Sequence, residues 1–191
     1  MAVIGDPTDY DAAAEVIRRR GLTGVYEEVL HILRAVPIRV LKKRQANGAA
    51  DIRERIDAGF DAAGGWTKTQ VGGVDWVKEI SLRSGTNVAF AALGVEVQVS
   101  GRSVMLYRDI SHLRQSLNGA KIDAGVIVVP DNELARYLTD RTPTMREALE
   151  TVADVRADQV PIRLLPIGLD GFVDTALPKR RTNVGRDPNS G

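Results

Sequence analysis

Leu93-Gly94-Val95-Glu96-Val97-Gln98-Val99-Ser100 is the stretch of sequence that decides the fold. Its valines alternate with Glu96 and Gln98, which is the two-residue period of a β-strand. β-branched residues along one face of a strand suit packing against a core. The opposite face carries a carboxylate and a carboxamide side by side, and such groups are costly to bury without partners. The stretch therefore predicts either a half-exposed strand with ordinary polar residues outside or a strand that carries a functional site.

A second carboxylate, that of Asp75, stands near the start of another strand-like segment, residues 74–82. Residues 88–100 form the second strand of the pair, and the residues between them, 83–87, are typical of a turn. Asp75 and Glu96 are 21 positions apart (96 − 75). A hairpin that turns at residues 83–87 brings these two carboxylates close together in space.

Helical and extended patterns alternate along the rest of the chain. Helical spacing of apolar residues predicts helices over residues 11–20, 22–36, 49–63, 104–117, 132–138 and 145–152. Apolar runs predict further extended segments over residues 38–41, 124–129 and 161–169. We therefore expect an α/β fold with a mixed central β-sheet flanked by helices. Gly94 is expected to mark a bulge or a bend in its long strand.

The length of 191 residues predicts one domain, spanning residues 1–191, in which the polar segment 178–191 is a loose C-terminal tail. The chain has no cysteine, which excludes disulfides, cysteine-type zinc sites and thiol catalysis and fits a cytoplasmic location. With only two histidines, a histidine-rich metal site is not expected. No apolar run reaches the roughly 18 residues of a membrane span, and the first residues lack the features of a signal peptide.

The charge of the chain is nearly balanced, at a formal net value of +1, so composition alone does not predict a nucleic-acid partner. Basic residues are nevertheless clustered at positions 18–20, 39–44 and 179–181. Local clusters matter more than the net charge for binding a polyanion. Each cluster taken alone is nonetheless more typical of a solvated face than of a binding site.

The two carboxylates of the hairpin suit a hard divalent cation. Mg²⁺ prefers a few carboxylate oxygens, a backbone carbonyl and retained waters, and the carbonyl of Val97 lies between Glu96 and Gln98. Such an ion lowers the pKa of a water and neutralises charge on a scissile phosphate. Glycosidases also use a pair of carboxylates as their catalytic groups. That alternative is weaker because aromatic residues are only 5% of the chain and no sugar-stacking platform is evident.

A series of short motifs runs along most of the chain. In order, they are Thr8-Asp9-Tyr10, Ala14-Glu15-Val16-Ile17, Glu27-Glu28-Val29-Leu30, Gly65-Trp66, Val74-Asp75-Trp76-Val77-Lys78, Val95-Glu96-Val97-Gln98, Lys121-Ile122-Asp123-Ala124-Gly125-Val126 and Val160-Pro161-Ile162-Arg163-Leu164. In their order and rough spacing these motifs resemble the BglII/BstYI group of type II restriction endonucleases, within the PD-(D/E)XK nuclease superfamily. Each motif is weak alone, and the resemblance depends on the whole series.

The resemblance implies a restriction-endonuclease-like fold and a Mg²⁺-dependent homodimer that cuts double-stranded DNA. The group typically recognises a short palindrome with a GATC centre and leaves 5′ overhangs. Asp75 matches the first metal carboxylate of the family and Glu96 the second, with the Val97 carbonyl completing the metal site. Gln98 stands where the superfamily usually has Lys. We expect its carboxamide to orient the attacking water rather than to take the proton from it.

The resemblance also predicts DNA contacts. Ser100 matches a residue that faces the bases, and Gly101 replaces an Asn beside it. Arg102 is expected to reach a base edge, a phosphate or solvent. Lys43, Arg44 and the run from Lys179 to Arg181 are candidates for phosphate contacts.

Four further features of the sequence allow only less specific expectations. The segment between the carboxylates is longer than in the family pattern, which predicts an extended hairpin. Asp123 is either a site residue or a structural residue. Another polar group of the family site falls near Thr69 or Gln70. The apolar face of helix 104–117 is either a dimer surface or an ordinary core face.

The leading hypothesis is therefore a type II restriction endonuclease. Two other classes remain as alternatives. One is a catalytically inactive DNA-binding protein of the same fold, against which the intact Asp75, Glu96 and Gln98 argue. The other is a cytoplasmic interaction protein, which is supported only by the near-neutral charge.

Overall fold

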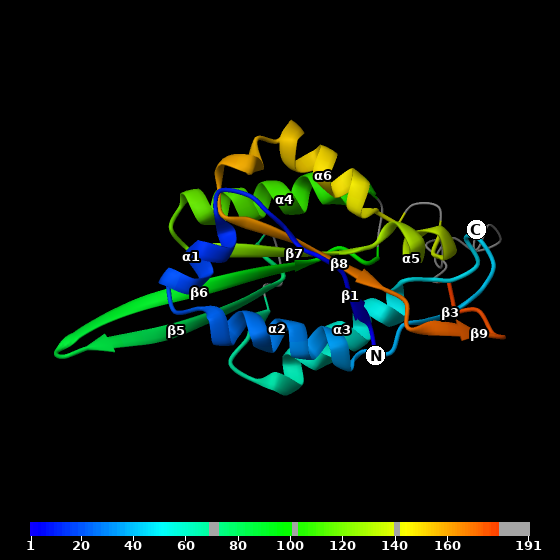
Figure 1. Ribbon diagram of the computed structural model, residues 1–191, viewed down its shortest axis with the longest axis horizontal. Helices are drawn as coiled ribbons and strands as arrows, with labels where there is room; N and C mark the ends of the chain where they lie inside the picture. The colour runs from blue at the N-terminus through cyan, green and yellow to red at the C-terminus, as the bar shows by residue number, and fades with distance from the viewer. Residues whose placement is uncertain (69–72, 101–102, 140–141, 180–191) are drawn as a thin grey trace, which may run out of the picture.

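The computed structural model describes residues 1–68, 73–100, 103–139 and 142–179. A central mixed sheet of seven strands carries helices on both faces (Figure 1). The strand order is β1-β8-β7-β6-β5-β4, and β2 also pairs with β8. The strands of this sheet are β1 (Val3–Ile4), β2 (Thr8–Asp9), β4 (Thr67–Lys68), β5 (Trp76–Ser84), β6 (Asn87–Val97), β7 (Ala124–Pro130) and β8 (Ile162–Gly168). The expected α/β class is confirmed.

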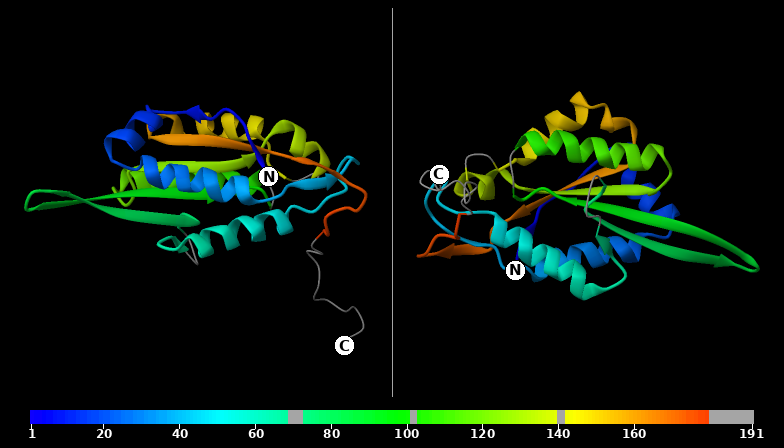
Figure 2. Two further views of the ribbon diagram at one scale, coloured as in Figure 1. Left: turned by 60° about the horizontal axis from the view of Figure 1, so that its bottom comes forward. Right: turned by 180° about the vertical axis from the view of Figure 1, so that it is seen from behind.

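Six helices accompany the sheet in the described part of the chain. They are α1 (Ala13–Arg19), α2 (Thr23–Ala35), α3 (Ala50–Ala63), α4 (Ser103–Asn118), α5 (Asn132–Tyr137) and α6 (Met145–Asp154). Helices α2 and α3 cover one face of the sheet, and α4 and α6 cover the other (Figures 1 and 2). A separate two-stranded parallel sheet pairs β3 (Arg39–Leu41) with β9 (Gly171–Val173). A short 3₁₀ helix spans Ala157–Gln159.

Strand β6 is the centre of the fold because both of its faces are buried at its C-terminal end. Val95, Val97 and Val99 belong to the core beneath α2 and α3. Glu96 and Gln98 alternate with them and therefore face α4, and both are buried. The two-residue period predicted this arrangement, but the polar face lies inside the protein rather than in solvent.

The β5–β6 hairpin turns at residues 85–86 and pairs in an unbroken antiparallel register from Trp76↔Val95 to Ser84↔Asn87. Its far end projects beyond the helices (Figure 1), as the long segment between the carboxylates predicted. The expectation of a bulge at Gly94 is wrong, because Gly94 pairs in register with Val77. A Cβ at position 94 would lie 2.7 Å from the Ile122 side chain. Close packing therefore explains this glycine.

Helix α4 packs closely on the sheet at that point. Gly94 pairs with Gly125 of β7, and a Cβ at position 125 would lie 2.6 Å from the side chain of Leu113. Leu106, Ile110 and Leu113 of α4 are fully buried in a core shared with α6. Of the two roles expected for this helix face, the contacts show the core role.

At most of the other helix and strand ends, the observed boundary differs from the expected one by a few residues. The strand expected to reach residue 100 ends at Val97, although the Gln98 N–H still donates to the Val128 carbonyl at 2.8 Å. The short strands β1, β2, β4 and β9 were not expected. Most of the expected tail, residues 180–191, lies outside the described residues. No helix in the described residues is long and apolar enough to span a membrane.

Candidate active site

The hairpin brings Asp75 and Glu96 together at the C-terminal end of β6. Asp75 lies immediately before β5, and its Oδ2 accepts a hydrogen bond from the Val97 N–H at 2.9 Å. That bond ties the start of β5 to β6 beside Glu96. The two carboxyl groups and the Val97 main chain therefore share one location, as the hairpin argument predicted.

Glu96 is buried at this location, with 2% of its surface exposed. Burial raises the pKa of its carboxyl group to about 10, and the nearby carboxylates of Asp75 and Asp109 add to the rise. Its Oε1 atom is buried and has no hydrogen-bond partner among the described residues. A buried carboxyl group between two other carboxyl groups is an environment in which a cation would be strongly stabilised.

Gln98 is held by Asp109, a residue of α4 that the sequence analysis missed. The Nε2 group of Gln98 donates to Asp109 Oδ2, and the other carboxylate oxygen accepts from Arg108 Nε at 3.0 Å. Burial raises the pKa of Asp109, and Arg108 opposes the rise. The Gln98 Oε1 atom has no partner in the described part of the chain. This oxygen is therefore a buried acceptor that no described group uses.

Arg53 of α3 is the second residue that sequence reasoning missed. Its Nη1 donates to the Val97 carbonyl, its Nη2 lies 3.1 Å from Asp75 Oδ1, and its side chain is largely buried. Its Nε donates to Asp57 at 3.0 Å, one helical turn further along α3. Asp57 in turn accepts from the indole N–H of Trp76 at 2.9 Å.

Weak sequence signals for both residues existed. Asp109 lies on the same helical stripe as the buried Leu106, Ile110 and Leu113, which is an unusual place for an acid. Arg53 and Asp57 have the spacing of an ion pair on one helix face, which is common on any helix.

The residues fit a divalent cation with few protein ligands. The described residues contain no group of three His, Cys, Asp or Glu side chains placed to hold a metal ion. Mg²⁺ is usually bound by one or two carboxylates and retains several waters. Asp75, Glu96 and the Val97 carbonyl supply such a set, and the unpartnered Glu96 Oε1 is a free donor atom within it. Arg53 contacts two of these three groups.

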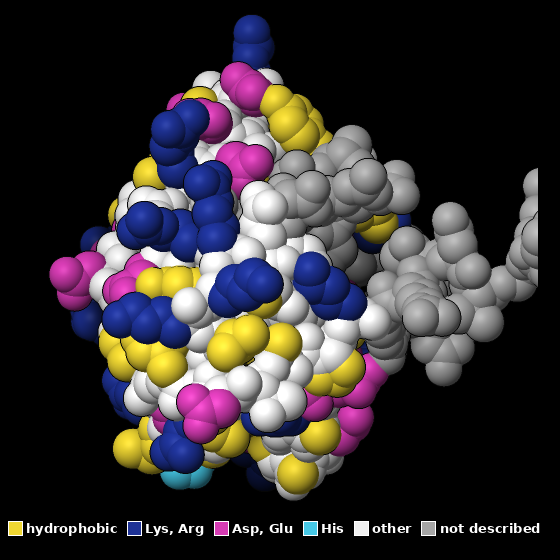
Figure 3. Space-filling model, turned by 90° about the vertical axis from the view of Figure 1, so that its right-hand side faces the viewer, with side chains coloured by type: hydrophobic (Ala, Val, Ile, Leu, Met, Phe, Trp, Pro, Cys, Tyr) yellow, Lys and Arg dark blue, Asp and Glu magenta, His cyan; other side chains and the backbone are white. Residues whose placement is uncertain are grey.

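The other predicted site residues lie elsewhere or outside the described residues. Ser100 lies in the bend after β6 and is half-buried. Lys43 and Arg44 are exposed in the turn after β3. Strand β3 lies on the right-hand side of the molecule in Figure 1, and Figure 3 shows Lys and Arg side chains across the middle of that side. Lys179 reaches the same turn, with its Nζ 2.6 Å from the Gln45 carbonyl. Arg102, Thr69 and Gln70 lie outside the described residues.

Asp123 has a structural role. It accepts a hydrogen bond from the Ala92 N–H at 2.8 Å and pairs with Arg20 of the segment after α1. Ala92 lies four residues before Glu96 on β6 (96 − 92), away from the site end of the strand. Asp123 therefore fixes β6 relative to the start of β7.

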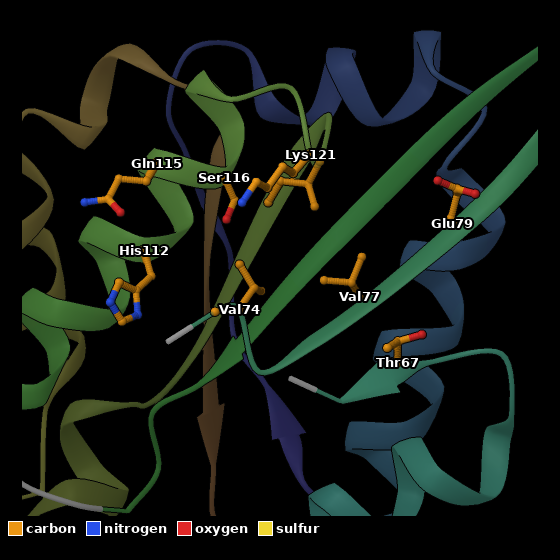
Figure 4. Close-up of a pocket in the computed structure, with 10 residues that line it drawn as sticks. Thr67, Val74, Val77, Glu79, His112, Gln115, Ser116 and Lys121 are labelled. Carbon is orange, nitrogen blue, oxygen red and sulfur yellow. The ribbon is translucent and has the colours of Figure 1, made fainter. Parts of the chain in front are cut away.

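A cavity of about 650 Å³ lies next to the site on the α4 face of the hairpin. It lies between α4, from which His112 and Gln115 project, and the sheet edge, which contributes Thr67, Val77 and Glu79 (Figure 4). Asp75, Glu96 and Gln98 do not line it.

Comparison with known protein families decides the identity of the chain. The family model described as restriction endonuclease BglII/BglIII matches residues 7–168. The chain belongs to this family. The resemblance inferred from the short motifs is therefore confirmed, as is the restriction-endonuclease-like fold. A comparison with curated proteins found no match.

Membership of the BglII/BglIII family fixes the general activity. The protein is a type II restriction endonuclease, an enzyme that cleaves DNA at specific sites by hydrolysing phosphodiester bonds. The matched range, residues 7–168, extends from before β2 to the end of β8 and contains the candidate site. Restriction endonucleases of this kind generally use a divalent metal.

Proposed function

We propose that this restriction endonuclease is a Mg²⁺-dependent homodimer that cuts a short palindrome in double-stranded DNA, with Asp75, Glu96 and Gln98 as its catalytic residues. The observation that carries this proposal is the convergence of the Asp75 and Glu96 carboxyl groups beside the Val97 main chain. A palindrome has twofold symmetry, and a homodimer matches it. A GATC-like centre and 5′ overhangs rest on the family likeness alone.

Asp75, Glu96 and the Val97 carbonyl are the groups that would hold Mg²⁺. When bound, the ion would neutralise charge on the scissile phosphate and lower the pKa of a water. Glu96 must lose its proton to act as a ligand, because its pKa is raised to about 10 in the absence of a cation. Binding of the ion is therefore expected to release a proton from this carboxyl group.

Gln98 orients the attacking water. Its Nε2 donates to Asp109, which leaves the buried Oε1 as the unused acceptor of the amide. An ionised carboxylate only accepts hydrogen bonds, so Asp109 favours this orientation of the carboxamide over the flipped one. A carboxamide does not take up a proton near neutral pH. Gln98 is therefore not the general base, and the proton of the attacking water goes to another acceptor, such as bulk or metal-bound water.

The candidate DNA contacts come from the segment after the active strand and from the turn after β3. Ser100 and Arg102 follow the active strand in the sequence and are the candidates for base or phosphate contacts. Lys43 and Arg44 contact phosphates, which position the duplex without reading its sequence. The near-neutral net charge makes these local groups more important than the overall field.

Cleavage should require both a divalent ion and the Glu96 carboxylate. Purified protein incubated with phage DNA and Mg²⁺ should give discrete fragments on a gel and none in excess EDTA. Glu96→Ala should lose at least ~100-fold of the cleavage rate, because it removes a carboxylate that stabilises charge in the transition state. Glu79→Ala is the matched control, since Glu79 is an exposed acid on β5 of the same hairpin and should leave the rate unchanged.

Several outcomes would contradict the proposal. A smear, or no cutting with Mg²⁺ or Mn²⁺, would count against site-specific hydrolysis, and full activity of Glu96→Ala would refute the assigned residues. Specific binding without cutting would favour the inactive DNA-binding alternative. Sequencing the ends of the fragments would give the recognition site and the overhang.

A further inference from the structure

Arg53 occupies a position that the proposed function assigns to a cation. Its guanidinium group donates to the Val97 carbonyl and lies 3.1 Å from Asp75 Oδ1. These are two of the three groups that would hold the metal. One delocalised positive charge therefore already contacts the donor set in the DNA-free protein.

The position of Arg53 is fixed by a chain of contacts that leads away from the site. Its Nε donates to Asp57, and Asp57 accepts from the buried indole of Trp76 at 2.9 Å. Lys68 Nζ also lies 3.0 Å from Asp57. The side chain of Arg53 is only 18% exposed, so packing as well as charge limits the other conformations that it can adopt. The contact is thus built into the fold by three separate elements, α3, β4 and β5.

Arg53 and a divalent ion would compete for the same groups. A divalent ion bound to Asp75 Oδ1 and the Val97 carbonyl would lie close to the guanidinium group, and like charges at that separation repel. Arg53 already uses one acceptor site on each of these two oxygens. Charge repulsion therefore opposes simultaneous contact of the ion and Arg53 with them.

We propose that Arg53 is a built-in cation that holds the metal-binding groups in place in the absence of metal and is displaced when a divalent ion binds. This inference rests on the metal site of the proposed function. Arg53 keeps the Asp75 carboxylate and the Val97 carbonyl aligned by direct hydrogen bonds. It also competes with the metal, so it lowers the affinity of the DNA-free protein for divalent ions.

The test measures binding of Mn²⁺ to DNA-free protein by titration calorimetry. Arg53→Gln keeps a hydrogen-bonding side chain and removes the competing charge, so it should bind Mn²⁺ about tenfold more tightly, a difference of about 1.4 kcal/mol. A residue that served only to support the site would give the opposite result, weaker binding. Arg53→Lys, which keeps the charge, should stay near the wild-type affinity.

The matched control is Arg55→Gln on the same helix. Arg55 pairs with Asp51 and donates to the Pro37 carbonyl at 3.1 Å, away from the donor set. Its replacement should change the Mn²⁺ affinity less than twofold. Equal or weaker binding by Arg53→Gln than by the wild type would overturn the proposal.

Failure of the metal site itself gives a different result. Glu96→Gln should abolish saturable Mn²⁺ binding in both the wild-type and the Arg53→Gln backgrounds. Mn²⁺ binding that depends on Glu96 but is not tighter in Arg53→Gln would refute only the role of Arg53 and would leave the metal site standing. Binding that does not depend on Glu96 would refute the metal site, and the inference about Arg53 with it.

A second readout uses the wild-type protein and does not depend on the variants folding. The NMR signal of the Arg53 Nε–H group should shift on titration with Mg²⁺, because its guanidinium group leaves Asp75 and Val97. The Arg55 signal should not move. An Arg53 signal unchanged at saturating Mg²⁺ would contradict displacement.

Discussion

At the scale of single residues, the site depends on a carboxyl group whose ionised form is disfavoured by its surroundings. Glu96 is buried beside Asp75, and a third carboxyl group, that of Asp109, lies nearby on α4. Burial and these neighbours raise its pKa from 4.5 to about 10. The metal-free protein therefore holds a proton at Glu96 that a bound cation would replace.

The pH dependence of stability follows from this shift. Between pH 4.5 and about 10 the folded protein binds a proton at Glu96 that the unfolded chain does not. The free energy of unfolding in EDTA should therefore fall as the pH rises through this range. Glu96→Gln removes the titrating group and with it this contribution to the pH dependence of stability. The Tm of the variant, measured by differential scanning calorimetry, should therefore fall less between pH 6 and pH 9 than the Tm of the wild type.

Glu79→Gln serves as the control in this series, since Glu79 is an exposed acid of the same hairpin. Its Tm should follow the wild type at every pH. An identical decline for Glu96→Gln and the wild type would show that Glu96 does not retain its proton in the folded state.

The site could be predicted only in part from the sequence. Asp75, Glu96 and Gln98 were proposed together because they lie on one hairpin, where period and turn position fix which residues meet. Arg53 and Asp109 were missed because they reach the site from helices on opposite faces of the sheet. Such contacts depend on how helices pack, which local patterns do not specify.

At the scale of the elements, a pair of glycines sets how closely α4 lies over the site. Gly94 of β6 and Gly125 of β7 are paired, and Leu113 of α4 lies directly against Gly125. Asp109 is one helical turn from Leu113 and contacts Gln98. Close packing of α4 on the two strands therefore brings the Asp109 carboxylate within reach of the Gln98 amide.

Gly125→Ala should disturb this packing. The added Cβ would lie 2.6–3.0 Å from three atoms of the buried Leu113 side chain, so the protein should lose about 1–3 kcal/mol of unfolding free energy. Urea denaturation measures the loss. Gly24→Ala in α2 is the control, because no described atom outside the local helix would lie within 4 Å of its Cβ, and it should be neutral or mildly stabilising. Equal stability of the two variants would contradict the packing argument.

The long elements were predictable and the short ones were not. Strands β5 to β8 and the helices have periodic apolar patterns that extend over enough residues to be recognised. Strands β1 and β2 are two residues each and exist because β8 offers them an edge to pair with. Gly94 was assigned to a bulge because its real reason, contact with Ile122 and Val74, involves residues far away in the sequence.

At the scale of the whole molecule, the fold gathers the proposed chemistry at one end of a mixed sheet. The hairpin supplies Asp75 and Glu96, α3 supplies Arg53 from one face, and α4 supplies Asp109 from the other (Figure 1). The family match over residues 7–168 covers this whole arrangement. The α/β class and the family could both be inferred from the sequence, whereas the presence of the Arg53 guanidinium group in the site could not.

The most direct test is the anomalous scattering of Mn²⁺ in crystals of the protein. The account predicts a peak within about 2.0–2.3 Å of oxygens from Asp75, Glu96 and the Val97 carbonyl, with the Arg53 guanidinium group moved away from them. A peak elsewhere, or an Arg53 still bound to Asp75 and Val97 with no Mn²⁺ beside Glu96 at saturating concentration, would contradict it.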